Sequence, residues 1–253
     1  AGRNYQGLCP FHAEKTPSFV VFPETGTWHC FGACGTGGDI LTFIMKRENL
    51  SFGEALRMLA PRAGVELEAR SPRAEEAERR LDLLREINQA AATYYHHLLL
   101  ESDEAARARA YLEGRGLEAA TLERFQLGYA LDQWDGVIRY LGNKSYAIAD
   151  LMEAGLVVEK EETGSHYDRF RGRIMFPIRD LQGRTIGFGA RAMGDAMPKY
   201  MNSPQTPLFD KSKVLYGLDQ ARAGIRTAGE AVIVEGYMDV LMAHQHGINN
   251  VVA

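Results

Sequence analysis

Apolar residues recur at helical spacing in two early segments and again over a long stretch after residue 80. The residues that follow Asp39 and Ser51 carry apolar side chains three and four positions apart, and both polar residues can cap the helix that follows. Glu54, three residues after Ser51, completes a capping-box pattern. From Leu81 to Leu98 the same period continues for several turns, which predicts a long amphipathic helix.

The stretch before the long helix has a different composition. Residues 66–80 carry few apolar side chains, contain a Ser-Pro pair and are densely charged with both signs, which indicates a linker that leads into a helix. We therefore expect a small domain over residues 1–65, this linker, and a larger domain over residues 81–253.

Helical and alternating patterns are mixed in the larger domain. A basic and apolar alternation over 173–179, a turn at 180–183 and a second alternation over 184–191 predict a hairpin with Ile174, Phe176 and Ile178 on one side. The remaining predicted helices are 105–113, 119–125, 147–154 and 240–246. The remaining predicted strands are 127–131, 156–158 and a buried strand at 231–234. The interleaving predicts a mixed α/β (α+β) fold.

The chain has 253 residues and a formal net charge of -4, which argues against uniform attraction to nucleic acid. No apolar run approaches the roughly 18 residues that span a bilayer, and the first residues lack a secretory pattern. We expect a soluble cytoplasmic protein without a membrane partner. Because residues 1–8 lead directly into a cysteine motif and the last residues stop where a strand begins, we also expect a fragment of a longer chain.

The cysteines of the chain all lie in one early segment. Cys9 and His12 form one pair, and Cys30 and Cys34 form a second pair across a short predicted hairpin. Three cysteines leave one unpaired in any disulfide scheme, whereas a Cys₃His set suits one closed, structural Zn²⁺ site. Three residues separate the second pair where two are usual, so His29 stays open as an alternative ligand to Cys34.

Basic residues are concentrated after residue 165, where acidic residues are sparse. Guanidinium and ammonium groups spaced along strands can follow successive phosphates, while Tyr200 offers a stacking surface and Asn202 a neutral donor. The pattern favours a polyanionic partner, with an ordinary solvated sheet face as the alternative. The basic residues are Arg169, Arg171, Arg173, Arg179, Arg184, Arg191, Lys199, Lys211 and Lys213.

One carboxylate occupies a position typical of ligand sites. Glu235 ends the predicted strand at 231–234 and precedes a glycine and a helix, at the edge where open α/β sheets bind ligands. It is our catalytic candidate. Asp239, one turn into the helix, is either its partner or a surface acid.

These motifs, in this order, resemble those of bacterial replicative DNA primases. The resemblance rests on Cys-Pro-Phe-His and Cys-Phe-Gly-Ala-Cys, Arg-Phe-Arg-Gly-Arg from Arg169, Pro-Lys-Tyr-Met-Asn-Ser-Pro from Pro198, Leu-Tyr-Gly-Leu from Leu215, and Glu-Gly-Tyr-Met-Asp from Glu235. It spans nearly the whole chain. It implies a zinc-ribbon template-binding domain followed by a primase core that ends in the start of a Toprim fold, from about residue 229.

The resemblance also implies roles for individual residues. Cys9, His12, Cys30 and Cys34 would hold zinc, and Glu235 would be the Toprim acid that binds Mg²⁺ or manages a proton. Lys199 and Lys211 match basic positions of catalysis or nucleotide binding. The template groove would include Arg169, Arg171, Arg173, Arg191 and Asn202. The paired aspartates of the family would lie beyond Ala253.

The implied activity is synthesis of an RNA primer at replication forks. A single-stranded DNA template would direct Mg²⁺-dependent (or Mn²⁺-dependent) transfer of ribonucleoside triphosphates, giving an RNA–DNA hybrid, and the replicative helicase would bind a region outside this chain. Two alternatives remain: a zinc-dependent single-strand binding module without catalysis, and another Toprim enzyme such as a topoisomerase or nuclease.

Overall fold

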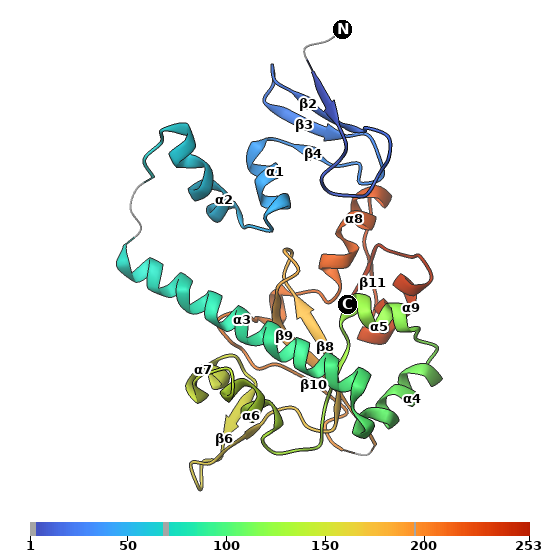
Figure 1. Cartoon of the computed structure of the whole chain (residues 1–253). Helices are drawn as coiled ribbons and strands as arrows, with labels where there is room; N and C mark the ends of the chain where they lie inside the picture. Colours follow the sequence, from blue (N-terminus) through green and yellow to red (C-terminus); the bar gives the residue numbers. More distant parts are fainter. Residues whose placement is uncertain (1–3, 68–70, 195) are drawn as a thin grey trace. The chain divides into compact units, whose positions relative to one another are not determined.

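The computed structural model describes residues 4–67, 71–194 and 196–253, and the chain divides into two compact units, Ala1–Ser71 and Pro72–Ala253 (Figure 1). The long helix α3 (Pro72–Glu101) begins inside the segment predicted as linker, and the side chains that it buries start at Leu84. The predicted linker residues 68–70 lie outside the described residues.

The first unit is built on a small antiparallel sheet. Its strands pair in the order β1 (Tyr5–Gly7), β2 (Phe19–Phe22), β3 (Thr27–Cys30) and β4 (Gly37–Gly38). A Cβ on Gly37 would lie 2.7 Å from the carbonyl oxygen of Trp28, so the β3–β4 pairing requires a glycine there. The core is a cluster of rings, in which Trp28 stacks on Phe19 at 5.2 Å and meets Phe43 edge-on at 5.7 Å.

Two short helices complete the first unit, α1 (Ile40–Arg47) and α2 (Phe52–Leu59), followed by a 3-10 turn over Ala60–Ala63. The predicted caps are confirmed: the Asp39 side chain accepts from the amide of Thr42, and Ser51 and Glu54 form a complete capping box.

The second unit is centred on an antiparallel sheet in the order β10 (Tyr200–Asn202), β9 (Thr185–Ala192), β8 (Arg173–Arg179) and β5 (Gly128–Ala130). Helix α3 runs across one face of this sheet (Figure 1). Its residues Leu84, Ile87 and Tyr95 share a core with Met175 and Phe188.

The opposite face of the sheet carries a second core. Ile174, Phe176 and Ile178 pack there with Val240 and Leu241 of α9 (Tyr237–Gln245), so the predicted common side of these three residues is confirmed. Because both faces are covered, nearly every residue of β8 and β9 is buried, including Arg173 and Arg191. Arg173 and Arg191, which were expected to extend a basic strip along the hairpin, are therefore buried within it.

The remaining elements surround this sheet. They are η2 (Asp103–Ala105), α4 (Ala106–Gly114), α5 (Ala119–Phe125), α6 (Gly136–Gly142), α7 (Ile148–Glu153), the hairpin β6 (Val157–Glu159) and β7 (His166–Asp168), η3 (Lys211–Lys213), α8 (Leu218–Ala228), and the parallel pair β11 (Val232–Ile233) and β12 (Val251–Val252). Val232 and Ile233 are exposed, contrary to the predicted buried strand: among the described residues β11 pairs with β12 alone.

None of the helices in the described ranges has both the length and the apolar character that a membrane span needs.

Candidate functional site

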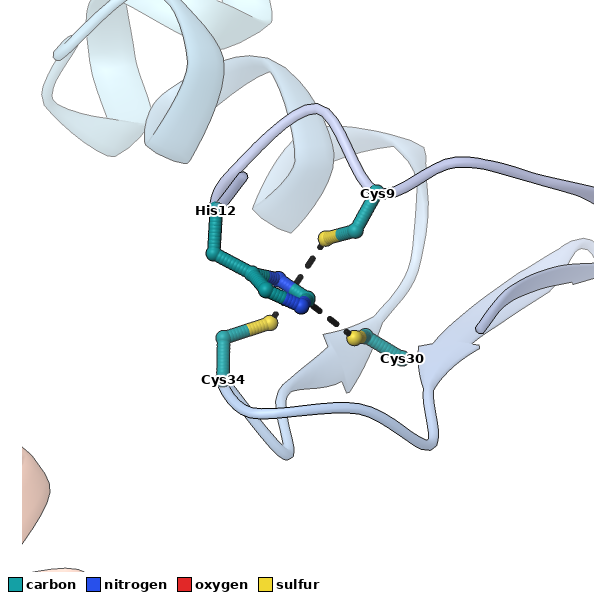
Figure 2. Close-up of side chains that lie close together, drawn as sticks. All are labelled: Cys9, His12, Cys30 and Cys34. Carbon is teal, nitrogen blue, oxygen red and sulfur yellow. Dashed lines mark hydrogen bonds between the residues drawn. The ribbon is translucent and has the colours of Figure 1, made fainter. Parts of the chain in front are cut away.

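Four side chains of the first unit converge on one point (Figure 2). One ligand atom from each of Cys9, His12, Cys30 and Cys34 lies within 4.8 Å of all the others. The sulfurs of Cys9 and Cys34 are 3.7 Å apart, and Cys30 Sγ lies 3.9 Å from His12 Nδ1. Two thiolates on one tetrahedral Zn²⁺ are separated by about 3.8 Å when each Zn–S bond is about 2.3 Å long. The donor set and its spacing therefore fit zinc.

His29, the alternative ligand, lies outside this group. Its ring is 4.6 Å from that of Phe31, and its buried Nδ1 has no hydrogen-bond partner among the described residues. The turn at this pair ends at Gly35, whose φ is 51° and whose amide donates to the carbonyl of Gly32 at 3.1 Å. The structure thus groups Cys34, rather than His29, with the other three residues.

The surroundings of the sulfurs act on the thiols in opposite directions. The amides of Phe11 and Gly32 donate to Cys9 and Cys30 at 3.4 and 3.3 Å. Burial raises the pKa of Cys9 to about 11. Burial also acts to raise the pKa of Cys34, but hydrogen bonds, chiefly with Thr36, outweigh it and lower the pKa to about 7. A bound cation would deprotonate the thiols outright, so metal binding here releases protons.

Glu14 holds the first ligand pair in place, and the sequence patterns did not identify it. Its carboxylate lies 3.0 Å from His12 Nε2 and accepts from the amides of Cys9 at 2.7 Å and Ser18 at 3.1 Å. The Ser18 hydroxyl donates to the same carboxylate and lies 3.3 Å from Cys30 Sγ. A Cβ on Gly32 would approach Ser18 Oγ to 2.4 Å, so glycine leaves room for this network.

Because Nε2 of His12 contacts Glu14, Nδ1 is the nitrogen left to bind metal. A carboxylate on the second nitrogen of a metal-binding histidine fixes both the ring and its tautomer. The one feature of the sequence that could have indicated this role of Glu14 is its position two residues after His12.

A cavity of about 630 Å³ in the second unit brings together residues that are distant in sequence. Tyr200 and Asn202 of β10, Lys211 of η3 and Glu235 after β11 all line it. These four predicted site residues therefore share one pocket, with Asp239 of α9 beside them. Glu235 and Lys211 are exposed, so each can reach a ligand. Lys199 is exposed but does not line this pocket.

Tyr237, two residues after Glu235, anchors this pocket. Its hydroxyl donates to Oδ1 of Asn202 at 2.6 Å, and its ring stacks on Phe176 at 4.8 Å. A Cβ on Gly189 would lie 2.3 Å from the Tyr237 ring, so β9 needs a glycine at this position. Burial raises the pKa of Tyr237 to about 12, which keeps the hydroxyl protonated as a donor.

The predicted template arginines are held in defined positions, although they do not form an open strip. Arg173 donates to the carbonyl of Pro198 at 2.8 Å, Arg191 lies 4.1 Å over the ring of Tyr111, and Arg171 lies 4.2 Å over that of Trp134. Burial lowers the pKa of Arg169 and of Arg173.

Ion pairing separates the arginines of the hairpin into two groups. Arg179 and Arg184 lie within 4.0 and 2.8 Å of the carboxylates of Asp219 and Asp180. Across residues 4–67, 71–194 and 196–253, no carboxylate pairs with the other group, which is Arg169, Arg171, Arg173 and Arg191. The charge of these four guanidinium groups is therefore not neutralised by any carboxylate in the described residues.

Two hydroxyl groups near Asn202, those of Ser203 and Thr206, accept hydrogen bonds from the backbone. The hydroxyl of Ser203 accepts from the amide of Phe188 at 2.9 Å, and that of Thr206 accepts from the amides of Leu208 and Phe209. These bonds shape the loop after β10.

Comparison with known proteins gives matches in both units. Residues 1–75 match the CHC2 zinc finger model, and residues 94–222 match the model described as the DNA primase catalytic core, N-terminal domain. The DNA primase of Deinococcus radiodurans is 50% identical over 98% of this chain, which spans 42% of that protein.

Solved structures agree with these matches. The zinc-binding and RNA polymerase domains of the Aquifex aeolicus primase align with 100% of this chain and 60% of that chain, at 35% identity and a TM-score of 0.62. A DnaG primase catalytic domain bound to ssDNA aligns with 70% of this chain and 54% of that chain, at 41% identity and a TM-score of 0.63. Since one family model covers about half of the sequence and a second covers the metal cluster, the chain belongs to the DNA primase family, with a CHC2 zinc finger followed by the N-terminal part of the catalytic core.

Proposed function

We propose that this chain is the template-handling and nucleotide-binding part of a primase that synthesises RNA primers on single-stranded DNA. The observation that carries the proposal is the shared pocket, in which Glu235, Lys211 and Asn202 meet although they come from three separate sequence motifs. Relatives named as DNA primases and a similar catalytic domain solved with ssDNA support the same assignment.

The zinc centre has a structural role in this proposal. One Zn²⁺ is held by Cys9, His12, Cys30 and Cys34. These four protein ligands complete its tetrahedral coordination and leave no position for a substrate. The metal stabilises a unit whose apolar core is a small ring cluster. The unit then presents its surface to the template.

The pocket is the proposed nucleotide site. Glu235 and Asp239 supply the carboxylate oxygens that Mg²⁺ or Mn²⁺ prefers, and the exposed Lys211 is placed to pair with a phosphate. A divalent cation at such a site neutralises phosphate charge during nucleotidyl transfer. In the proposed reaction a primer 3′-hydroxyl attacks the α-phosphate of a ribonucleoside triphosphate, and pyrophosphate leaves.

The template follows the unpaired arginines. Arg169, Arg171, Arg173 and Arg191 carry charge that no described carboxylate neutralises, and Tyr200 adds an aromatic face beside Arg191 at 5.9 Å. The product is an RNA–DNA hybrid. The replicative helicase engages a region outside this chain, and the setting is the bacterial cytoplasm at replication forks.

Two neighbouring lysines provide the test. Lys211 lines the pocket, whereas Lys213 is 78% exposed and pairs with Asp210 at 3.1 Å. Primer synthesis on a single-stranded template is measured with the intact parent protein and radiolabelled ribonucleotides. Lys211→Gln should lower kcat/KM for ribonucleotides by about tenfold or more, because one charge-assisted phosphate contact is lost, and Lys213→Gln should keep it. Equal activity of the two variants would remove Lys211 from the site, and no primer synthesis by the unaltered parent would overturn the proposal.

A further inference from the structure

The loop between β10 and η3 leads to Lys211, and buried contacts fix its conformation. Phe209 is 2% exposed and lines the pocket, and a Cβ on Gly187 of β9 would lie only 3.1 Å from its ring. The amide of Phe209 donates to the hydroxyl of Thr206 at 3.0 Å, and the amide of Thr206 donates to the carbonyl of Phe209 at 3.1 Å. The backbone that enters η3 is therefore held against the sheet.

Asp210 caps the turn that follows. Its Oδ1 accepts from the amide of Ser212 at 3.0 Å and from the hydroxyl of Ser212 at 2.7 Å. The backbone closes the same turn, because the amide of Lys213 donates to the carbonyl of Asp210 at 2.9 Å. A cap of this kind satisfies an amide that the turn itself leaves without a partner. Since Lys211 is the first residue of η3, the direction of its side chain depends on the turn that Asp210 closes.

The second oxygen of Asp210 controls the local charge. The hydrogen bond from the Ser212 hydroxyl, followed by that from Lys213, lowers the pKa of Asp210, so the carboxylate is charged at neutral pH. A lone carboxylate next to a residue that lines the pocket would repel a triphosphate, but Oδ2 lies 3.1 Å from Nζ of Lys213, which offsets the charge. Across the described residues, no carboxylate forms an ion pair with Lys211. The segment therefore presents one cation to the pocket and neutralises the other.

We infer that Asp210 is a positioning residue of the proposed nucleotide site, because its cap on η3 directs Lys211 to the phosphates of a ribonucleoside triphosphate. The inference rests on the proposed function, which it deepens by naming the side chain that holds the lysine in place. The site requires the oxygen that accepts from Ser212, and the negative charge is secondary.

Substitutions of Asp210 separate the cap from the charge. Asp210→Asn keeps an oxygen that can cap the turn but removes the charge. Asp210→Glu keeps the charge but places the carboxylate one carbon further along the side chain, and Asp210→Ala removes both. In primer synthesis by the intact parent protein, KM for ribonucleotides should stay within about twofold of the wild type for Asp210→Asn. It should rise by about fivefold or more for Asp210→Glu and Asp210→Ala, with a smaller change in kcat.

A double-mutant cycle tests whether Asp210 acts through Lys211. Because Lys211→Gln already lacks the ammonium group, adding Asp210→Glu to it should raise KM by no more than about a further twofold. Asp103→Ala is the matched control, since Asp103 is an exposed acid in the 3-10 turn η2, and it should keep the wild-type KM. Full additivity of the two changes would mean that Asp210 acts by another route and would overturn the inference.

The remaining outcomes separate the inference from the proposed function. Circular dichroism melts accompany the kinetics, and a melting temperature within about 4 °C of the wild type shows that a variant is folded. If Asp210→Ala fails to fold, the comparison of Asp210→Asn with Asp210→Glu still decides. Equal KM values in these two variants would overturn the positioning role of the cap, and with an impaired Lys211→Gln the proposed function would stand. A wild-type KM in Lys211→Gln would remove Lys211 from the site and the inference with it.

Discussion

The hydroxyl of Tyr237 donates a 2.6 Å hydrogen bond to Oδ1 of Asn202, and this bond joins the first turn of α9 to the end of β10. It connects two motifs that lie 35 positions apart in the sequence. Because Oδ1 is occupied, the amide hydrogens of Asn202 remain available to a ligand in the shared pocket. Tyr237 therefore orients a donor at the proposed nucleotide site.

Tyr237→Phe should separate this orienting role from packing. The variant keeps the ring that stacks on Phe176 but loses the hydroxyl, so the free energy of unfolding should fall by only about 1 kcal/mol. KM for ribonucleotides should rise in a primer-synthesis assay with the parent protein. Tyr146→Phe, which alters a residue packed in the core on the opposite face of the sheet, should leave KM unchanged. A KM shift of the same size in both variants would contradict an orienting role.

Metal content should distinguish Cys34 from His29. Cys34→Ser removes one of the four grouped ligand atoms, and the purified chain should then retain clearly less than one zinc per chain after dialysis against a weak chelator. His29→Gln should keep the full zinc content, because His29 lies outside the group. Metal analysis by mass spectrometry checks both. Zinc loss in the His29 variant with retention in the Cys34 variant would reverse the assignment.

Glu14→Gln should weaken zinc binding without removing a ligand. The substitution keeps the size of the side chain but replaces an oxygen that contacts His12 and Ser18 with an amide group, and outer partners of this kind typically contribute 10- to 100-fold in affinity. Competition with a chromogenic chelator measures the change. Lys15→Gln, at an exposed neighbouring position, is the control and should match the wild type. An unchanged affinity in Glu14→Gln would mean that the ligands are positioned without it.

Stability of the second unit should fall as the pH drops below about 6.5. Burial lowers the pKa of His244, whose Nε2 donates to the carbonyl of Val251 at 2.9 Å while Nδ1 faces Arg124 at 3.4 Å. A second proton on the His244 ring would place a positive imidazolium beside the guanidinium of Arg124. Since an unfolded histidine has a pKa of about 6.5, the unfolded chain binds more protons below that value, and acid favours unfolding.

Urea unfolding between pH 8 and pH 5.5 tests this linkage. His244→Gln should show a flatter dependence of the free energy of unfolding on pH, and the exposed control His246→Gln should keep the wild-type slope. Identical slopes in the wild type and the His244 variant would rule out His244 as the source.

Much of the fold followed from local pattern. The caps at Asp39 and Ser51, the hairpin of β8 and β9, and the common side of Ile174 and Phe176 all depend on residues a few positions apart, where periodicity and capping chemistry act directly. The grouping of Cys9 with Cys34 was also foreseeable, because two tight turns on a short ribbon leave few other arrangements.

What the patterns did not predict depends on contacts across the fold. Arg173 and Arg191 look like surface residues by composition, yet α3 and α9 cover both faces of their sheet and make them buried. The role of Glu14 depends on its hydrogen bond from Ser18 and on the space that Gly32 leaves for Ser18. Both arise only when the chain folds. Trp134 has no helical or strand periodicity around it, and its partner Arg171 comes from a distant motif.

The most direct test of the central claim replaces the carboxylate of Glu235, two residues after β11. Primer synthesis and DNA binding are measured together in the intact parent protein with Glu235→Gln and with the matched exposed control Glu230→Gln. If Glu235 serves the proposed transfer reaction, Glu235→Gln should reduce primer synthesis by about 100-fold or more while single-stranded DNA binding persists, and Glu230→Gln should remain active. Undiminished primer synthesis by Glu235→Gln would contradict the account of the pocket as the catalytic site.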